Sequence, residues 1–149
     1  MAAGDLFAYN DFAHQLAANE VILDSDTFKV ALYTSTWSPA QTDADPIYTV
    51  TNEVSGTNYS AGGATVTSGF ALNLNGAVSE IQPQGGAPQV SWTQHAAGPT
   101  NIRTGMLYSD TASPKHAIAY ITFGVADISL VDGDITFTFS ANAFTITRS

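Results

Sequence analysis

The spacing of apolar residues near the N-terminus predicts one amphipathic helix. Apolar side chains recur there at intervals of three and four residues, at Leu6, Tyr9, Phe12, Ala13 and Leu16. This spacing places them in a single stripe on the surface of a helix. Asp5 is a suitable N-cap and Asn19 a suitable stop, so we expect a helix over residues 5–19.

Beyond residue 20 the period of the pattern changes to two, which is the period of β-strands. Runs rich in branched and aromatic side chains predict strands over residues 28–34, 64–67, 70–75, 77–81, 89–93, 105–108 and 116–123. Pairs of glycine, proline, asparagine and aspartate separate these runs, as they do at turns. Many short strands with closely spaced turns are typical of antiparallel sheets.

The clearest alternation lies at the C-terminal end of the chain. Two runs in which phenylalanine or isoleucine alternates with threonine, residues 135–139 and 144–147, are separated by only four residues. A short connection between two alternating runs is typical of a β-hairpin. We therefore expect the two runs to pair with each other, with Phe137 and Phe144 facing the core.

Together these elements predict a mainly β protein. We expect one domain over residues 1–149, built as an antiparallel β-sandwich, jelly-roll-like or Ig-like, with one short N-terminal helix. A chain of 149 residues suits one domain and buries enough surface to hold a core without metals or disulfides. The sequence has no internal repeat that would suggest another architecture.

The charge of the chain argues against two classes of partner. The formal net charge is -9, and lysine and arginine together number only four. Proteins that bind nucleic acids or anionic membranes need clusters of basic residues. No apolar run approaches the ~18 residues of a membrane span, and the first residues lack the features of a signal peptide. We expect no nucleic acid and no membrane partner.

Charged residues make up 11% of the chain, against about 25% in an average soluble domain. Short neutral side chains take their place. Such a surface packs against another protein with little desolvation of charge. The alternative is a β-rich protein that simply carries threonine on its exposed strand faces, and composition leaves both interpretations open.

Catalytic motifs are sparse in this sequence. The absence of cysteine excludes thiolate catalysis and cysteine-bound zinc. The spacing of His14, His95 and His116 does not couple any of them to a serine nucleophile, so we expect structural roles for all three. The sequence therefore predicts no enzymatic activity, no catalytic residue and no cofactor.

Three pairs of aspartates could supply oxygen ligands to calcium: Asp24 and Asp26, Asp43 and Asp45, and Asp132 and Asp134. None of the pairs continues into the Asp-x-Asp-x-Asp-Gly loop that would specify a calcium site. Turn formation accounts for all three pairs, and we expect no bound metal. Two carboxylates could also serve a glycosidase.

One polar segment, TNEVSGTNYSAGGATV at residues 51–66, has too few apolar residues for a core strand and too clear a pattern for a linker. Its glycines supply backbone conformations that other residues avoid, and its tyrosine is of a type enriched at interfaces. The candidate partner-contact residues are Asn52, Glu53, Gly56, Asn58, Tyr59, Gly62 and Gly63. The alternative is that Tyr59 folds back onto its own domain and the segment is only a long connection.

Three blocks of the chain carry a family resemblance: DSDTFKVALYTS at 24–35, VTNEVSGTNYSAGGAT at 50–65, and IAYITFG at 118–124 followed by DGDITF. They resemble a family of small structural proteins of tailed bacteriophages, associated with capsid decoration, or cement, proteins. The resemblance covers roughly residues 21 to 147, and the second block is its most specific part. Asn58 stands where the family pattern has glycine, but asparagine also tolerates the left-handed backbone region.

The resemblance implies a structural virion protein that binds the outside of the phage shell and stabilises it. The major capsid protein would be its partner, and the symmetry of the shell and the habit of the family suggest a homotrimer. It would be located on the capsid surface of a virion assembled in the host cytoplasm. A tail, neck or baseplate component is the first alternative. A carbohydrate-binding or hydrolytic β-sandwich is an alternative of another class.

Overall fold

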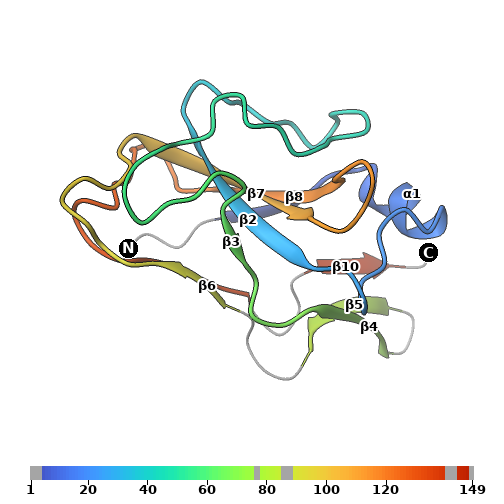
Figure 1. Ribbon diagram of the computed structural model, residues 1–149. Coiled ribbons are helices and arrows are strands. Elements are labelled where there is room, and N and C mark those ends of the chain that lie inside the picture. The colour runs from blue at the N-terminus through green and yellow to red at the C-terminus, as the bar shows by residue number, and fades with distance from the viewer. Residues whose placement is uncertain (1–4, 76–77, 85–88, 140–143, 148–149) are drawn as a thin grey trace.

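The computed structural model describes residues 5–75, 78–84, 89–139 and 144–147 (Figure 1). Strands dominate it, and helix is confined to six residues. The elements are β1 (Asp5–Ala8), α1 (Phe12–Ala17), β2 (Phe28–Thr34), β3 (Ala64–Thr65), β4 (Phe70–Asn75), β5 (Val78–Pro83), β6 (Gln89–Trp92), β7 (Ile102–Ser109), β8 (Ala117–Thr122), β9 (Ile135–Thr138) and β10 (Phe144–Thr147). The prediction of a mainly β chain with very little helix is confirmed.

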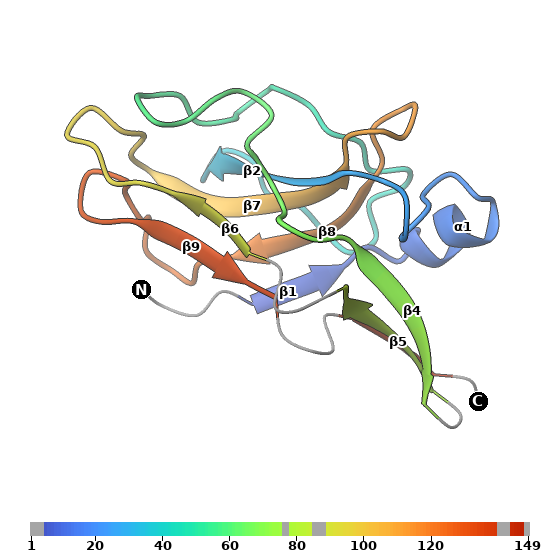
Figure 2. The same ribbon diagram turned by 60° about the horizontal axis from the view of Figure 1, so that its bottom comes forward.

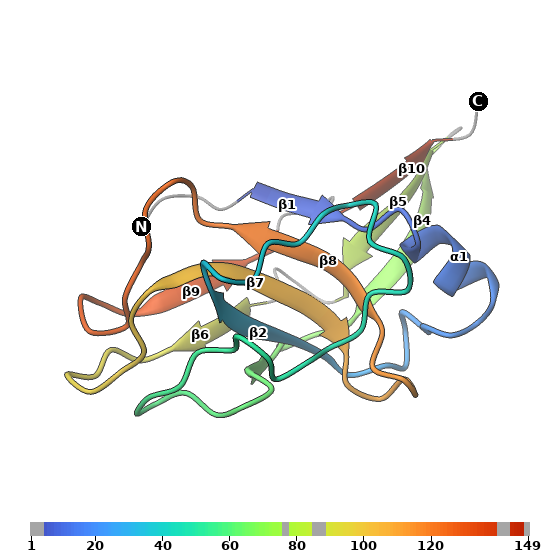
Figure 3. The same ribbon diagram turned by 90° about the horizontal axis from the view of Figure 1, so that it is seen from above.

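The strands form three sheets in which every pair is antiparallel. The largest has the order β1-β8-β7-β2-β3, the second β10-β5-β4, and the third contains only β6 and β9. Figures 1 and 2 place both smaller sheets on the same side of the five-stranded sheet. The connection after β2 crosses the other side, as seen from above in Figure 3.

The larger core cluster is shared by the five-stranded sheet and the two smaller sheets. On β2, Phe28, Val30 and Leu32 point into this cluster, since alternate residues of a strand share one face. Phe70 of β4 meets Phe28 edge to face, with ring centroids 5.3 Å apart. Each such side chain contributes roughly 1.5–3 kcal/mol through burial.

A second cluster fills the opposite face of the five-stranded sheet and is rich in tyrosine. Its buried members include Tyr9, Tyr33, Tyr108 and Tyr120, with Trp37 and Tyr48 of the connection after β2 packed against them. The ring centroids of Tyr33 and Trp37 are 4.4 Å apart, and those of Tyr48 and Tyr108 are 4.6 Å apart. Aromatic packing therefore holds this connection against the sheet, and both faces of β2 are buried.

The predicted helix over residues 5–19 is wrong in its first half. Residues 5–8 form β1, which pairs with β8 so that Leu6 lies opposite Ile121. The first part of the apolar pattern that suggested a helix belongs instead to an edge strand. This strand gains backbone hydrogen bonds from β8. The helical N-cap is Asp11 and not Asp5, whereas Asn19 ends the helix with a φ of 60°, as expected of a stop residue.

The predicted C-terminal hairpin is also wrong. β9 pairs with β6, and β10 pairs with β5, so the two runs belong to different sheets. Alternation identified both strands, but it does not specify which strand each will pair with. Phe137 is half-buried and packs against the larger core cluster. The side chain of Phe144 and the expected turn at 140–143 lie outside the residues that the structure describes.

The described part of the chain has no helix with the length and apolar character needed to cross a bilayer.

Replacing Phe70 by alanine should lower the free energy of unfolding by about 3–5 kcal/mol, because its buried ring contacts both Phe28 and Phe139. The control is Leu72→Ala on the same strand, where the side chain is 55% exposed and the loss should stay below about 1 kcal/mol. Denaturant unfolding of both variants measures the difference. Equal stability of the two would contradict the described packing of β4.

Candidate functional site

Residues 52–63 are bound along the edge of β2 that β3 leaves open. β3 pairs with β2 only at two positions, Lys29 and Val30. Further along, the Val54 N–H donates to the Leu32 carbonyl at 3.0 Å, and the Thr34 N–H donates to the Asn52 carbonyl at 3.0 Å. The segment therefore continues the pairing of β2 without being a regular strand.

The Glu53 carboxylate is the centre of a hydrogen-bonded cluster. Its Oε2 accepts from the Tyr48 hydroxyl at 2.7 Å, and its Oε1 accepts from the Tyr59 hydroxyl at 2.6 Å and from the Gly62 N–H at 2.7 Å. We call these four residues the Glu53 cluster. Hydrogen bonds to an ionised carboxylate are roughly twice as strong as neutral ones. The cluster thus holds Tyr48, Tyr59 and Gly62 in fixed positions around Glu53.

Tyr59 packs on its own domain. Its hydroxyl donates to Glu53 and accepts from the Leu32 N–H at 2.8 Å, and its ring stacks on Trp92 with centroids 6.0 Å apart. Of the two alternatives that the sequence left open for this side chain, the structure shows the second. Tyr59 therefore folds back onto its own domain, and any contact of its half-buried side chain with a partner stays a prediction.

The two adjacent glycines are required by close contacts. A Cβ on Gly63 would lie 1.8 Å from the Val30 carbonyl oxygen, and the φ of this residue is +73°. Gly62 is buried with a φ of +92°, and its carbonyl accepts from the Tyr108 hydroxyl at 2.8 Å. Tyr108 lies 46 residues away, and no local pattern predicted its part in the loop.

The tip of the segment, residues 55–58, is exposed. Gly56 approaches Pro99 so closely that a Cβ would lie 2.6 Å from the proline nitrogen. The Thr57 N–H donates to the Ala97 carbonyl at 2.8 Å, and the Asn58 side-chain amide donates to the Thr93 carbonyl at 3.2 Å. The tip is thus held at several points and presents backbone and short neutral side chains. A partner-contact role remains a prediction for this exposed part.

The candidate residues from the sequence therefore divide into two groups. Glu53, Tyr59, Gly62 and Gly63 shape the loop from within, together with half-buried Asn52, whose φ of 65° makes a left-handed turn. Gly56 and Asn58 lie at the exposed tip.

Burial raises the pKa of several tyrosines around this loop. The pKa of Tyr48 rises to about 12, first because its hydroxyl is partly removed from water and second because it donates to Glu53. Burial and the hydrogen bond to Glu53 also raise the pKa of Tyr59. Burial is likewise the main cause of the raised pKa values of Tyr33 and Tyr108. These hydroxyls are therefore neutral donors over the physiological range.

The three histidines occupy unrelated sites. His14 is exposed near Asp11, and His95 accepts a hydrogen bond from the Ala97 N–H at 3.0 Å. His116 is buried, with Nδ1 3.2 Å from Asp45 and Nε2 3.9 Å from Glu20. Within residues 5–75, 78–84, 89–139 and 144–147, no hydrogen bond joins a histidine side chain to a serine hydroxyl.

One aspartate of each pair accepts hydrogen bonds from other groups of the protein. Asp26 accepts from the Ile22 N–H and the Ser109 hydroxyl, Asp43 from the Ala40 N–H, and Asp134 from the Gln94 N–H. Among the described residues, no group of three or more acidic, histidine or cysteine side chains could hold a metal ion.

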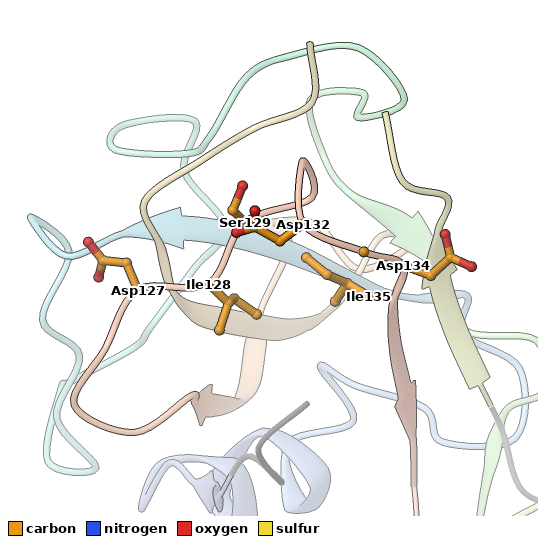
Figure 4. A pocket seen from close by; sticks show the side chains of 7 residues that line it. Asp127, Ile128, Ser129, Asp132, Asp134 and Ile135 are labelled. Carbon is orange, nitrogen blue, oxygen red and sulfur yellow. The ribbon is translucent and has the colours of Figure 1, made fainter. Parts of the chain in front are cut away.

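A pocket of about 330 Å³ at the connection before β9 is lined by three aspartates (Figure 4). Asp127 is paired with Arg103 at 2.6 Å, and Asp134 accepts from the Gln94 N–H at 2.7 Å. In Figure 4 the carboxylates of Asp127 and Asp134 lie on opposite sides of the pocket and point away from each other. Its acidic groups do not converge on one point.

Glu53→Ala should lower the free energy of unfolding by about 2–4 kcal/mol, because the Gly62 N–H and the Tyr59 hydroxyl would lose a charged acceptor in a buried setting. Asp132→Ala removes the same charge from an exposed position and should change stability by less than about 0.5 kcal/mol. Urea unfolding of both variants is the measurement. A Glu53→Ala variant as stable as the control would show that the cluster does not hold the loop.

The folded protein should lose stability as pH rises above 10. A raised folded-state pKa means that the tyrosine contribution is complete below the unfolded value of 10.0 and is lost as pH passes through the folded value, about 12 for Tyr48. Absorbance at the phenolate band and circular dichroism, followed together in an alkaline titration, should change at the same pH. The chain in denaturant should ionise near pH 10. Full ionisation near that pH with an intact fold would contradict the tyrosine contacts.

Comparisons with known proteins provide no further guide to this site. No family model matches the chain, and neither the curated proteins nor the solved structures gave a match. The function is therefore argued from the residues and their geometry.

Proposed function

We propose that the protein is a structural virion protein, a capsid decoration or cement protein that binds the outside of a phage shell. One observation carries the proposal. The segment with the most specific family resemblance, residues 52–63, is the one that the Glu53 cluster fixes to β2 and whose tip is exposed. A rigid loop loses little conformational entropy on binding, which favours attachment to a repeated surface.

The charges of the described surface fit a partner that is neutral or basic. Lys29 and Lys115 both pair with Asp110, at 2.8 and 2.6 Å, and Arg103 pairs with Asp127. Hydrogen bonds from Lys115 and from Lys29 hold the pKa of Asp110 below its usual range. All basic residues of the described ranges are thus already paired, and the remaining charge is acidic.

We also infer that the three sheets form the two layers of a β-sandwich, with the five-stranded sheet as one layer. The larger core cluster, which draws side chains from all three sheets, supports this arrangement. A jelly-roll-like or Ig-like topology remains a proposal, and the strand order in an experimental structure would distinguish them.

The carbohydrate-binding alternative has less support from the aromatic residues. Sugar sites generally need aromatic faces open to the ligand. Trp92 is buried in the larger core cluster, and Trp37 is half-buried and packs at a tilt against Tyr33. A tail, neck or baseplate role differs from the shell role chiefly in copy number.

The proposal is tested first on intact virions that carry the protein. Quantitative mass spectrometry should give hundreds of copies per particle, and an electron-microscopy map should place them on the outer shell, as trimers. A copy number of tens or fewer would instead support the tail, neck or baseplate role.

The loop itself is tested with Thr57→Arg, which adds a long side chain to the exposed tip and leaves the Thr57 backbone bond in place. Attachment to virions stripped of the protein should weaken by about tenfold or more, with an unchanged melting temperature. Thr138→Arg, an equal charge change at an exposed position of β9, should bind like the original chain. Normal attachment of Thr57→Arg would show that the tip is not the contact.

A further inference from the structure

An apolar groove lies between β4 and the segment that follows α1. These two elements lie at the opposite end of the molecule from residues 52–63 (Figures 1 and 2). Its volume is about 510 Å³. The apolar residues that line it are Leu16, Val21, Ile22, Leu23, Ala71 and Leu72. Two of them, Ile22 and Leu72, are 38% and 55% exposed, which is unusual for large aliphatic side chains in the described ranges.

The groove follows a strand edge that no other described segment pairs with. β4 is the last strand of its sheet, β10-β5-β4. The Phe70 N–H donates to the Leu23 carbonyl at 3.4 Å, and from Ala71 onward β5 supplies the only backbone partners of β4 among the described residues. An open edge presents unpaired N–H and C=O groups that accept a further strand.

The edge also lacks the features by which proteins usually prevent strand addition. The sequence of β4 is FALNLN, without proline and without any charged residue. Leu72 lies two residues after Phe70 and therefore on the same face of the strand, the face that enters the core. Its cross-strand neighbour Ile81 is fully buried, whereas Leu72 is not covered. The apolar row across the sheet thus ends at an open position.

The charged residues around the groove indicate which kind of molecule could bind there. Asp24 is an exposed carboxylate that lines the groove, and no basic residue lines it. The basic residues of the described ranges are engaged with Asp110 and Asp127. A second copy of this chain would bring its own carboxylate against the same rim, which opposes self-association here. An extended segment that alternates apolar with basic residues would satisfy the edge, the groove and the rim together.

We propose that β4 and this groove bind an extended segment of another protein, which adds as a strand beside β4 and alternates apolar side chains with lysine or arginine. Its apolar side chains continue the row that ends at Leu72, and a basic side chain faces Asp24. This surface is separate from residues 52–63, and the inference does not depend on the virion role.

The test is a selection of random peptides of about ten residues, a strand-like length, displayed against the immobilised full chain. Selected peptides should alternate apolar and basic residues. Their binding should weaken by about tenfold or more in the Leu72→Lys variant. This substitution replaces the exposed apolar side chain with a positive charge, which repels the basic residues of the peptide. Val50→Lys, the same change at another exposed aliphatic residue, should bind the peptides as the original chain does.

Methylation of alternate backbone nitrogens distinguishes strand addition from simple burial in the groove. Methylating one alternate set should abolish binding, and methylating the other set should have little effect, since only one set of N–H groups faces β4. Equal effects of the two sets would overturn the proposal.

Three other outcomes would also overturn the proposal. The first is a selected pool without basic residues, and the second is binding that survives Leu72→Lys. The third is dimerisation of the chain in sedimentation that Leu72→Lys abolishes, which would identify a second copy as the occupant. Both lysine variants alter exposed positions, so their melting temperatures should remain near that of the original chain.

Discussion

The geometry of the candidate loop depends on the hydrogen bonds that the carboxylate of Glu53 accepts. β2 lies inside the largest sheet, but along one of its edges the partner strand β3 pairs only with Lys29 and Val30. Beyond that point the buried backbone of β2 still needs hydrogen-bond partners. Residues 52–54 supply them, and the bonds from Glu53 to Tyr59 and Gly62 hold the irregular segment in place.

The same carboxylate connects the two sides of the five-stranded sheet. Tyr59 reaches from Glu53 toward Trp92 in the larger core cluster. Tyr48, bonded to the other carboxylate oxygen, stacks on Tyr108 in the tyrosine-rich cluster. Because tyrosine buries a large ring and keeps a polar tip, it can fill a core and still bond to a carboxylate near the surface. In the second cluster Tyr48 bonds to Glu53 in this way, whereas Tyr33 and Tyr108 donate to the backbone carbonyls of Thr49 and Gly62.

Beyond residue 20, local patterns in the sequence predicted which residues form strands but not which strands pair. The run at 28–34 became β2 as expected, because branched and aromatic side chains suit a strand that is buried on both faces. The runs at 135–139 and 144–147 are strands too, yet they pair with β6 and β5, which lie far away in sequence. Pairing depends on tertiary packing, and a short connection between two runs is only a weak guide to it.

The direction of Tyr59 could not be predicted for a related reason. Its partners are Glu53, six residues away, and the Leu32 N–H, 27 residues away. The glycines gave a better signal, since Gly62 and Gly63 do adopt the positive φ values that glycine favours. Sequence reasoning thus identified the unusual backbone of the loop, but the side chains that hold it became visible only in the folded chain.

The edge of β2 and the edge of β4 differ in how their backbone groups are paired, although the same physical rule applies to both. A buried or half-buried strand must have its backbone groups paired, by protein or by water. At β2 an irregular loop of the same chain pairs these backbone groups. The loop requires two glycines and a carboxylate that accepts hydrogen bonds from three donors. At β4 no described segment meets it beyond Ala71, and the uncovered side chain beside that edge is Leu72. Water can pair the backbone of β4 but does not bury the leucine side chain, whereas the added strand that we propose would do both.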